Sequence, residues 1–224
     1  MNNRASDAYI QEDWERFTSL DGMTNHWDRP GWTPGRRSYH WLITFEKDKK
    51  LQELAAACQE PLRGFEWLDL VPLNWLHLTL QRIAFTDEVT AGEVAAVAAA
   101  VQGRLACRPT FTMNVGPLAG SAGAVRFSVG PQELLIDIHS MVRDAIASAR
   151  QVVRPPAFVD FRPHISIAYS NTASPTAGLA HAISALRHIP QVQVPVERVT
   201  LVELKRVGAS YQWNTIALAT LDAG

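Results

Sequence analysis

Trp75-Leu76-His77-Leu78-Thr79-Leu80-Gln81 is a short stretch whose pattern recurs far downstream, in Pro163-His164-Ile165-Ser166-Ile167-Ala168. Each copy reads histidine, aliphatic residue, hydroxyl residue, aliphatic residue. Successive side chains of a β-strand point to opposite faces, so the imidazole and the hydroxyl of each copy share one face and the aliphatic side chains share the other. We therefore expect the aliphatic side chains to enter a core. Two such strands side by side would direct two imidazoles and two hydroxyls into one groove.

This set of side chains suits acid–base chemistry on a phosphodiester. An imidazole with a pKa near ~6.5 can accept or donate a proton at neutral pH, so we predict His77 and His164 as the general acid and the general base. The pattern leaves open which histidine plays which role. The hydroxyls of Thr79 and Ser166 can donate hydrogen bonds to phosphoryl oxygens, where negative charge concentrates during the reaction. One such motif alone would be a weak signal, and the paired occurrence is a stronger one.

The composition indicates an ordinary globular protein. Its 224 residues, of which 47% are hydrophobic and 19% charged, suffice for one large domain or two small lobes. A formal net charge of -1 argues against a protein held to nucleic acid by a large basic field, but is compatible with a small phosphate-bearing substrate. Residues 1–20 are polar, and no apolar run approaches the ~18 residues that span a bilayer. We therefore expect a cytoplasmic protein with no membrane contact.

The cysteines and the remaining histidines give no sign of a metal site. Cys58 and Cys107 lie far apart in the sequence, as expected of two free thiols in a reducing compartment. None of the other histidines stands at ligand spacing from a second histidine or a cysteine; these are His26, His40, His139, His181 and His188. We therefore expect no metal and no cofactor.

Periodicity and turn residues predict an alternation of strands and helices after residue 37. The expected strands lie within residues 38–45, 74–85, 109–117, 124–129, 164–170, 192–207 and 211–221, and the expected helices within 49–58, 87–105, a long segment from Pro131, and 176–187. Thr90 and Glu93 have the spacing of a capping box near the start of the second helix. Residues 116–123 are expected to form a hairpin turn, and residues 152–161, with two consecutive prolines, an extended or looped segment.

A loosely repeated pattern of strands and helices in the two halves of the chain predicts a duplicated fold. Strand 38–45, a helix and strand 74–85 resemble strand 124–129, a helix and strand 164–170, and each half ends in a histidine strand. We expect an α+β fold of two lobes related by a pseudo-twofold axis, with two antiparallel sheets flanked by helices and a central groove. This single bilobal domain would cover residues 37–224.

Residues 1–36 lie before this domain and are rich in turn signals. They also carry four apolar anchors, which are Trp14, Phe17, Trp27 and Trp32. We therefore expect residues 1–36 to form an N-terminal arm packed on the body.

The two motifs resemble the signature of the two-histidine (2H) phosphoesterase superfamily, in its 2′-5′ RNA ligase and cyclic phosphodiesterase-like branch. Residues 76–80 are similar to the first motif of that family and residues 161–168 to its second. The likeness covers residues 38–221 and leaves residues 1–36 outside. It implies a bilobal fold with a deep groove and metal-independent chemistry on 2′,3′-cyclic or other 2′-linked phosphates. It also implies His77 and His164 as the catalytic pair, with Thr79 and Ser166 as phosphate-binding hydroxyls.

Three further residues, Trp75, Arg162 and Tyr169, are candidates for substrate contacts. Many bacterial relatives carry a basic residue soon after the second motif, where this chain has Tyr169, and simple alternation puts Tyr169 on the core face. Arg162, two residues before the second histidine, can compensate, although a surface ion pair is the commoner role for it. Arg82 lies on the aliphatic face and reaches the groove only if its strand twists or bulges, and a surface ion pair is the commoner role for it too. Trp75 shares a face with the first histidine and can stack a base, although packing is the commoner fate of a tryptophan.

The leading interpretation is a metal-independent phosphoesterase that hydrolyses a 2′,3′-cyclic phosphate, or another 2′-linked phosphodiester, on a nucleotide or an RNA end. Two alternatives stay open. One is reversible 2′-5′ ligation of RNA ends, and the other is a relative that holds a nucleotide or RNA without turnover. Intact His77 and His164 weigh against the non-catalytic alternative. The expected partner is the phosphodiester substrate, with no obligatory protein partner, and the expected oligomeric state is a monomer.

Overall fold

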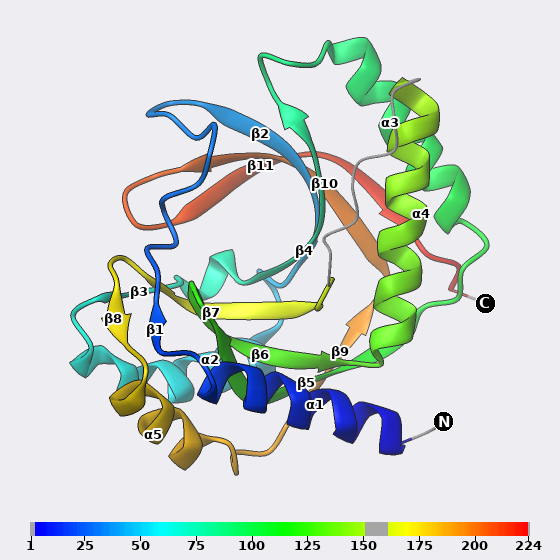
Figure 1. Cartoon of the computed structure of the whole chain (residues 1–224). Coiled ribbons are helices and arrows are strands. Elements are labelled where there is room, and N and C mark those ends of the chain that lie inside the picture. Colours follow the sequence, from blue (N-terminus) through cyan, green and yellow to red (C-terminus); the bar gives the residue numbers. More distant parts are fainter. Residues whose placement is uncertain (1–2, 151–160, 224) are drawn as a thin grey trace.

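Two antiparallel sheets carry the two histidine strands (Figure 1). The computed structural model describes residues 3–150 and 161–223. The four-stranded sheet has the order β11 (Tyr211–Thr220), β10 (Arg198–Arg206), β2 (Arg37–Thr44) and β4 (His77–Phe85). The five-stranded sheet has the order β3 (Leu68–Leu70), β7 (His164–Ser170), β6 (Ala124–Gly130), β5 (Phe111–Ser121) and β9 (Val192–Val196). A small separate pair joins β1 (Gly22–Met23) to β8 (Ser174–Pro175). The predicted α+β fold with antiparallel sheets is confirmed.

The strand orders of the two sheets correspond. The order β11-β10-β2-β4 in one sheet matches β9-β5-β6-β7 in the other. In each sheet the histidine strand pairs with an earlier strand that is followed by a helix. Strand β4 pairs with β2, which is followed by α2 (Lys49–Gln59), and β7 pairs with β6, which is followed by α4 (Gln132–Arg150). Strands β4 and β7 also contact each other, so the two histidine strands meet where the sheets meet. We call this region the junction.

Helices cover the outer sides of the sheets (Figure 1). Helix α3 (Ala91–Leu105) packs against α4 and β11, whereas α2 contacts β7 and β9, and α5 (Ala177–Leu186) contacts β5. Two short 3₁₀ turns, η1 (Glu60–Gly64) and η2 (Leu73–Trp75), precede β3 and β4. Helix α3 begins at the predicted capping box, in which the amide of Glu93 donates to the Thr90 hydroxyl and the amide of Thr90 donates to the Glu93 carboxylate. None of the described helices is long and apolar enough to cross a membrane.

The aliphatic residues of both motifs lie in the core, as predicted. Leu76, Leu78, Leu80, Ile165 and Ile167 are each 0% exposed. Burial of one such side chain contributes roughly 1.5–3 kcal/mol to folding. The packing behind each motif therefore fixes the position of the imidazole in front of it.

Strand β4 contains a β-bulge just after its motif. Thr79 pairs with Leu42 and Gln81 pairs with the adjacent Trp41, so Leu80 is an extra residue. A bulge reverses the alternation of the side chains beyond it. Arg82 therefore lies on the same face as Thr79. The sequence predicted that Arg82 reaches the groove only if the strand twists or bulges, and the strand does bulge.

Strand β7 contains the equivalent bulge. Ser166 pairs with Arg126 and Ala168 pairs with the adjacent Val125, so Ile167 is the extra residue. The expectation that Tyr169 faces the core with the aliphatic residues is therefore wrong. The bulge turns Tyr169 to the face of Ser166, although the side chain is only 4% exposed.

The N-terminal arm contains a helix that the sequence did not predict, α1 (Asn3–Thr18). The helix contacts β5, β6 and α5. The ring of Phe17 is fully buried, and it lies so close to Gly120 that a Cβ atom there would come within 2.3 Å of the ring. Only glycine at position 120 leaves room for this packing.

Three segments differ from the sequence expectation or fall outside the structure's description. Strand β5 runs on to Ser121, so the expected hairpin turn over residues 116–123 is shortened to Ala122-Gly123. The strands expected within residues 192–207 belong to different sheets, β9 to the five-stranded and β10 to the four-stranded one. The predicted extended or looped segment falls almost wholly on residues 151–160, which lie outside the described residues.

Candidate active site

His77 and His164 share one local geometry. Nδ1 of His77 donates a hydrogen bond of 2.8 Å to the carbonyl oxygen of Trp75, and Nδ1 of His164 donates one of 2.7 Å to that of Arg162. Each acceptor belongs to the residue two positions earlier. Because a carbonyl oxygen has no proton to give, Nδ1 carries the hydrogen, and Nε2 is the proton acceptor of each neutral ring.

The Nε2 atoms of the two rings are available for chemistry. Neither makes a hydrogen bond with the part of the chain that the structure describes, and neither is fully shielded from solvent. His77 as a residue is only 8% exposed. The rings are thus held from behind by main-chain acceptors and open at one nitrogen.

Burial lowers the pKa of both imidazoles. For His164 it is the main cause that lowers the pKa to about 3, and the charges of Arg126 and His77 lower it further. For His77 burial is again the main cause of a lowered pKa, while the hydrogen bond to Trp75 and the charge of Glu46 work in the opposite direction. Both rings are therefore neutral at pH 7 in the free protein. The charge of His77 acts on His164, so the two imidazoles lie in one region.

The two predicted hydroxyls accompany the histidines. Thr79 follows His77 on β4 and is partly buried, and Ser166 follows His164 on β7 and is 7% exposed. Before each bulge the strands alternate regularly, so histidine and hydroxyl share a face as predicted.

Tyr169 lies in an aromatic cluster at the junction. Its ring stacks on His26 with 3.9 Å between centroids and lies 5.6 Å from the ring of Tyr211. Tyr211 in turn lies 6.3 Å from the His77 ring. Burial raises the pKa of Tyr169, while a hydrogen bond with Ser166 lowers it, so the tyrosine is uncharged and linked to one of the predicted phosphate-binding hydroxyls. This cluster therefore connects the two sheets beside the histidines.

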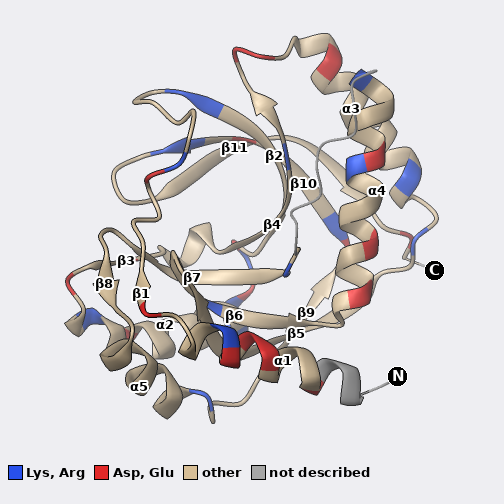
Figure 2. Ribbon diagram, in the orientation of Figure 1, with Lys and Arg blue, Asp and Glu red and all other residues tan. Residues whose placement is uncertain are grey.

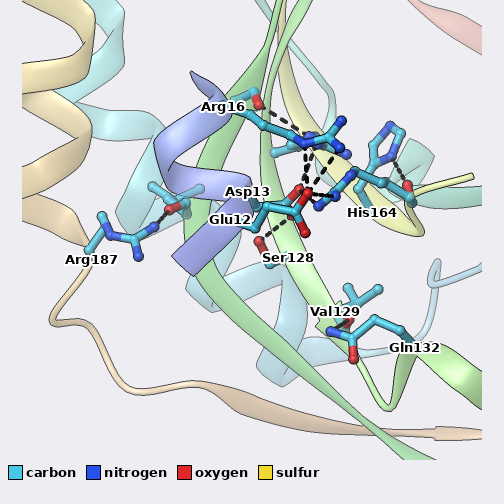
Figure 3. A network of polar contacts seen from close by, with 12 residues as sticks. Glu12, Asp13, Arg16, Ser128, Val129, Gln132, His164 and Arg187 are labelled. Atoms are coloured by element: carbon cyan, nitrogen blue, oxygen red, sulfur yellow. Dashed lines mark hydrogen bonds and ion pairs between the residues drawn. The ribbon is translucent and has the colours of Figure 1, made fainter. Parts of the chain in front are cut away.

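Arg162 is bound by acidic residues of helix α1, Glu12 and Asp13, which Figure 3 labels beside His164. Its guanidinium forms ion pairs with Glu12 at 2.5 Å and with Asp13 at 3.1 Å. Asp13 is fully buried and also pairs with Arg126 at 3.1 Å and accepts a hydrogen bond from Ser128 at 2.7 Å. The structure thus gives Arg162 the ion-pair role that the sequence ranked first.

Asp13 reaches the face of the five-stranded sheet that carries the second motif. Its partners Arg126 and Ser128 are the register partners of Ser166 and His164, and paired residues of neighbouring strands share a face. The acidic end of this network therefore neutralises the arginines on that side of His164.

Trp75 and Arg82 occupy the four-stranded side. Trp75 packs edge-to-face on Trp213 at 4.7 Å, within a small apolar cluster, so packing is its main role. Arg82 pairs in register with His40 and stacks on Phe85 at 4.8 Å. Burial, followed by the charge of Arg82, lowers the pKa of His40 to about 3. Arg82 is exposed and forms no ion pair with any described residue, so the expected surface ion pair is wrong for this arginine, which stacks on an aromatic ring instead.

The sequence missed the contribution of the N-terminal arm and of β11. His26, Tyr211 and Asp13 belong to no motif, and their places depend on contacts with residues far away in the chain. The apolar anchors of residues 1–36 were the only signal, and they indicated packing without a position. Within the described residues, no group of three or more His, Cys, Asp or Glu side chains is arranged to hold a metal ion.

Two lobes that each present a histidine strand at their junction define a two-histidine α+β protein. Residues 47–208 match the 2′-5′ RNA ligase superfamily, and the chain belongs to that superfamily, in agreement with the 2H phosphoesterase resemblance of its motifs. No curated protein matches the chain in sequence.

Solved structures share the fold at low sequence identity. The chain is similar to TT0787 of Thermus thermophilus, with a TM-score of 0.60 and 18% identity over 84% of this chain and 98% of that one. It is similar to E. coli LigT complexed with 3′-AMP, with a TM-score of 0.60 and 19% identity over 83% and 98%. A protein described as a phosphoesterase gives a TM-score of 0.62 and 17% identity over 84% and 99%. These neighbours are covered almost in full, so about a sixth of this chain has no counterpart in them.

Proposed function

We propose that this protein hydrolyses a 2′,3′-cyclic phosphate, or another 2′-linked phosphodiester, on a nucleotide or an RNA end, with His77 and His164 as general acid and base. The observation that carries the proposal is the repeated geometry of the two histidines. Both hold Nδ1 on a main-chain carbonyl and keep Nε2 open, which is the arrangement that proton transfer at two sites requires.

The reaction divides between the two rings. One Nε2 takes a proton from the attacking water, which forms the new phosphorus–oxygen bond. The other ring, as imidazolium, gives its proton to the departing 2′ or 3′ oxygen as that phosphorus–oxygen bond breaks. The free protein holds both rings neutral, since burial lowers both pKa values. The negative charge of a bound phosphodiester favours the protonated form of one ring, and so prepares the acid only when substrate is present.

The hydroxyls of Thr79 and Ser166 are proposed to donate hydrogen bonds to the non-bridging phosphoryl oxygens. Each lies two residues after a histidine and before the bulge, on the same face of its strand. Such donors stabilise the charge that develops in the transition state. The family membership supports an enzyme of the phosphoesterase and ligase class.

The test is hydrolysis of nucleoside 2′,3′-cyclic monophosphates and of a short RNA with a 2′,3′-cyclic end, in the presence of a chelator. We expect turnover at pH 7 with a single regioisomer of the product monophosphate, because fixed acid and base positions select one leaving oxygen. Failure to hydrolyse any of these substrates would overturn the proposal. Addition of an RNA with a 5′-hydroxyl tests the alternative, since a 2′-5′ linked product would identify the ligation reaction.

A further inference from the structure

The segment 22–36, which we call the strap, runs from the five-stranded sheet to the four-stranded sheet (Figure 1). On the five-stranded side, the amide of His26 donates to the Ser170 carbonyl at 2.7 Å, and Nε1 of Trp27 donates to Asp69 at 2.7 Å. On the four-stranded side, the guanidinium of Arg206 donates to the Trp27 carbonyl at 2.7 Å. The strap is therefore fixed at both sheets and passes the junction between them.

His26 of the strap touches residues of both sheets. Its ring stacks on Tyr169 at 3.9 Å, and its Nε2 lies 3.2 Å from the Tyr211 hydroxyl. Arg29 donates from Nε to the His26 carbonyl and from Nη2 to His26 Nδ1, each at 3.2 Å. Since arginine can only donate, Nδ1 of His26 must accept, and the ring stays neutral with its hydrogen on Nε2. Burial, followed by the charge of Arg29, lowers the pKa of His26 to about 2, which agrees with this tautomer.

Arg29 keeps an uncompensated positive charge. Arg126 and Arg162, on the five-stranded side, are paired with carboxylates of helix α1, and Arg36, also in the strap, is paired with Asp87 and Glu88. Arg29 is exposed, and among the described residues its guanidinium meets only the carbonyl and the ring of His26. Its charge also lowers the pKa of His164. Figure 2 shows how the coloured charges distribute around the strap and helix α1.

Arg206 and Arg82 also have no ion pair with a carboxylate among the described residues, but they are less suited to meet a ligand. Arg206 is enclosed by Trp27, Trp32 and Tyr211, and its Nε and Nη2 are buried without a partner among the described residues. Arg82 lies further along β4, and its guanidinium stacks on Phe85.

We propose that Arg29 of the strap binds the phosphate group of the substrate and stabilises its charge during the reaction. The inference rests on the proposed function, and it adds a residue that lies outside the matched family region and outside both histidine motifs. The guanidinium presents further N–H donors beyond the two that His26 uses, and a planar guanidinium suits two-point binding of phosphoryl oxygens. His26, Tyr169 and Tyr211 act as the support that holds Arg29 beside the junction.

The experiment compares Arg29→Met and Arg29→Lys with a matched control, Arg63→Met. Arg63 is exposed and, among the described residues, pairs only with Glu60, on the short turn η1. We expect Arg29→Met to lower kcat/KM for a nucleoside 2′,3′-cyclic phosphate by about 10²–10³-fold, the usual loss of one transition-state donor. Arg29→Lys should recover part of that loss, and Arg63→Met should equal the wild type. Circular dichroism melting should be unchanged in all three, because both arginines are exposed.

A second measurement keeps this inference separate from the proposed reaction. Binding of inorganic phosphate is measured by calorimetry, and Arg29→Met should weaken it at least tenfold while Arg63→Met does not. If the wild type hydrolyses nothing but shows this difference, the reaction is wrong and the anion-binding role of Arg29 stands. If the wild type is active and Arg29→Met matches Arg63→Met in turnover and in phosphate binding, Arg29 has no such role. Wild-type protein that binds no phosphate would also overturn the inference.

Discussion

At each proposed catalytic position, one main-chain carbonyl decides what the imidazole can do. The carbonyls of Trp75 and Arg162 hold the Nδ1 hydrogens and so direct the chemistry to Nε2. Replacement of either ring removes one proton carrier and leaves the other intact. Each histidine therefore serves the proposed chemistry, whereas its aliphatic neighbours carry the packing of the strand.

We expect His77→Ala and His164→Ala each to lower turnover by about 10²–10⁴-fold, the usual contribution of one general acid or base. The double variant should lose little more than the weaker single variant, because acid and base act in one step. His181→Ala, an exposed histidine on α5, is the control and should keep full activity. Steady-state hydrolysis of a cyclic nucleotide measures all four. A double variant that retains activity would exclude these histidines from the mechanism.

At the scale of the element, alternation predicted the start of each histidine strand and failed beyond it. The pattern of His77 to Thr79 and of His164 to Ser166 correctly gave a polar face and a buried aliphatic face. The bulges at Leu80 and Ile167 could not be predicted, because each depends on the register with a partner strand and no local glycine or proline marks it. Tyr169 was misplaced for this reason alone.

Helix α1 was missed. Its apolar residues Ile10, Trp14 and Phe17 do stand at helical spacing, but the turn signals of residues 21–35 dominate the segment 1–36 as a whole. The contacts that anchor the helix, such as Phe17 on Gly120 and Asp13 on Arg126, join residues far apart in the chain. The carboxylate of Asp13 is fully buried and satisfies partners on β6 and beside β7. Tertiary contacts of this kind carry no sequence signal within the helix itself.

Asp13→Ala should destabilise the protein by about 3–5 kcal/mol, because it leaves the Arg126 guanidinium buried without its carboxylate. Asp13→Asn should cost less, since an amide oxygen can still accept from Ser128. Glu15→Ala on the exposed side of the same helix should stay within about 0.5 kcal/mol of the wild type. Urea unfolding followed by circular dichroism gives the free energies. Equal stabilities for the two alanine variants would mean that the Asp13 network does not hold the helix.

At the scale of the whole molecule, four imidazoles with lowered pKa values gather around the junction. Burial is the main cause for each, and the lowered pKa is about 2 for His26 and about 3 for His40 and His164, with a lowered value for His77 also. In the unfolded chain each returns to about 6.5. Below pH ~6.5 the unfolded state therefore binds more protons than the folded state.

The free energy of unfolding should thus be highest above pH 7 and should fall as the pH drops from about 6.5 toward 3. Carboxylates such as Glu12 and Asp87 have lowered pKa values in pairs with arginines, and their contribution is lost only below about pH 4.5. Urea unfolding at pH 7.5, 6 and 5 isolates the histidine range. His40→Gln should reduce the slope of the unfolding free energy against pH by the equivalent of one proton, whereas His181→Gln, at an exposed position, should leave that slope unchanged. A stability that is flat between pH 7.5 and pH 5 would contradict buried neutral imidazoles.

The strap has a consequence for the order in which the molecule is assembled. His26 contacts Tyr211 across 185 positions of the chain, so this part of the strap finds its place only after β11 has been made. Closing so long a loop is costly in entropy, and chains rich in distant contacts fold slowly. The paired sheets and their core can therefore form before the strap docks. A newly made chain would carry both histidine strands in position for a time before the strap brings Arg29 to the junction.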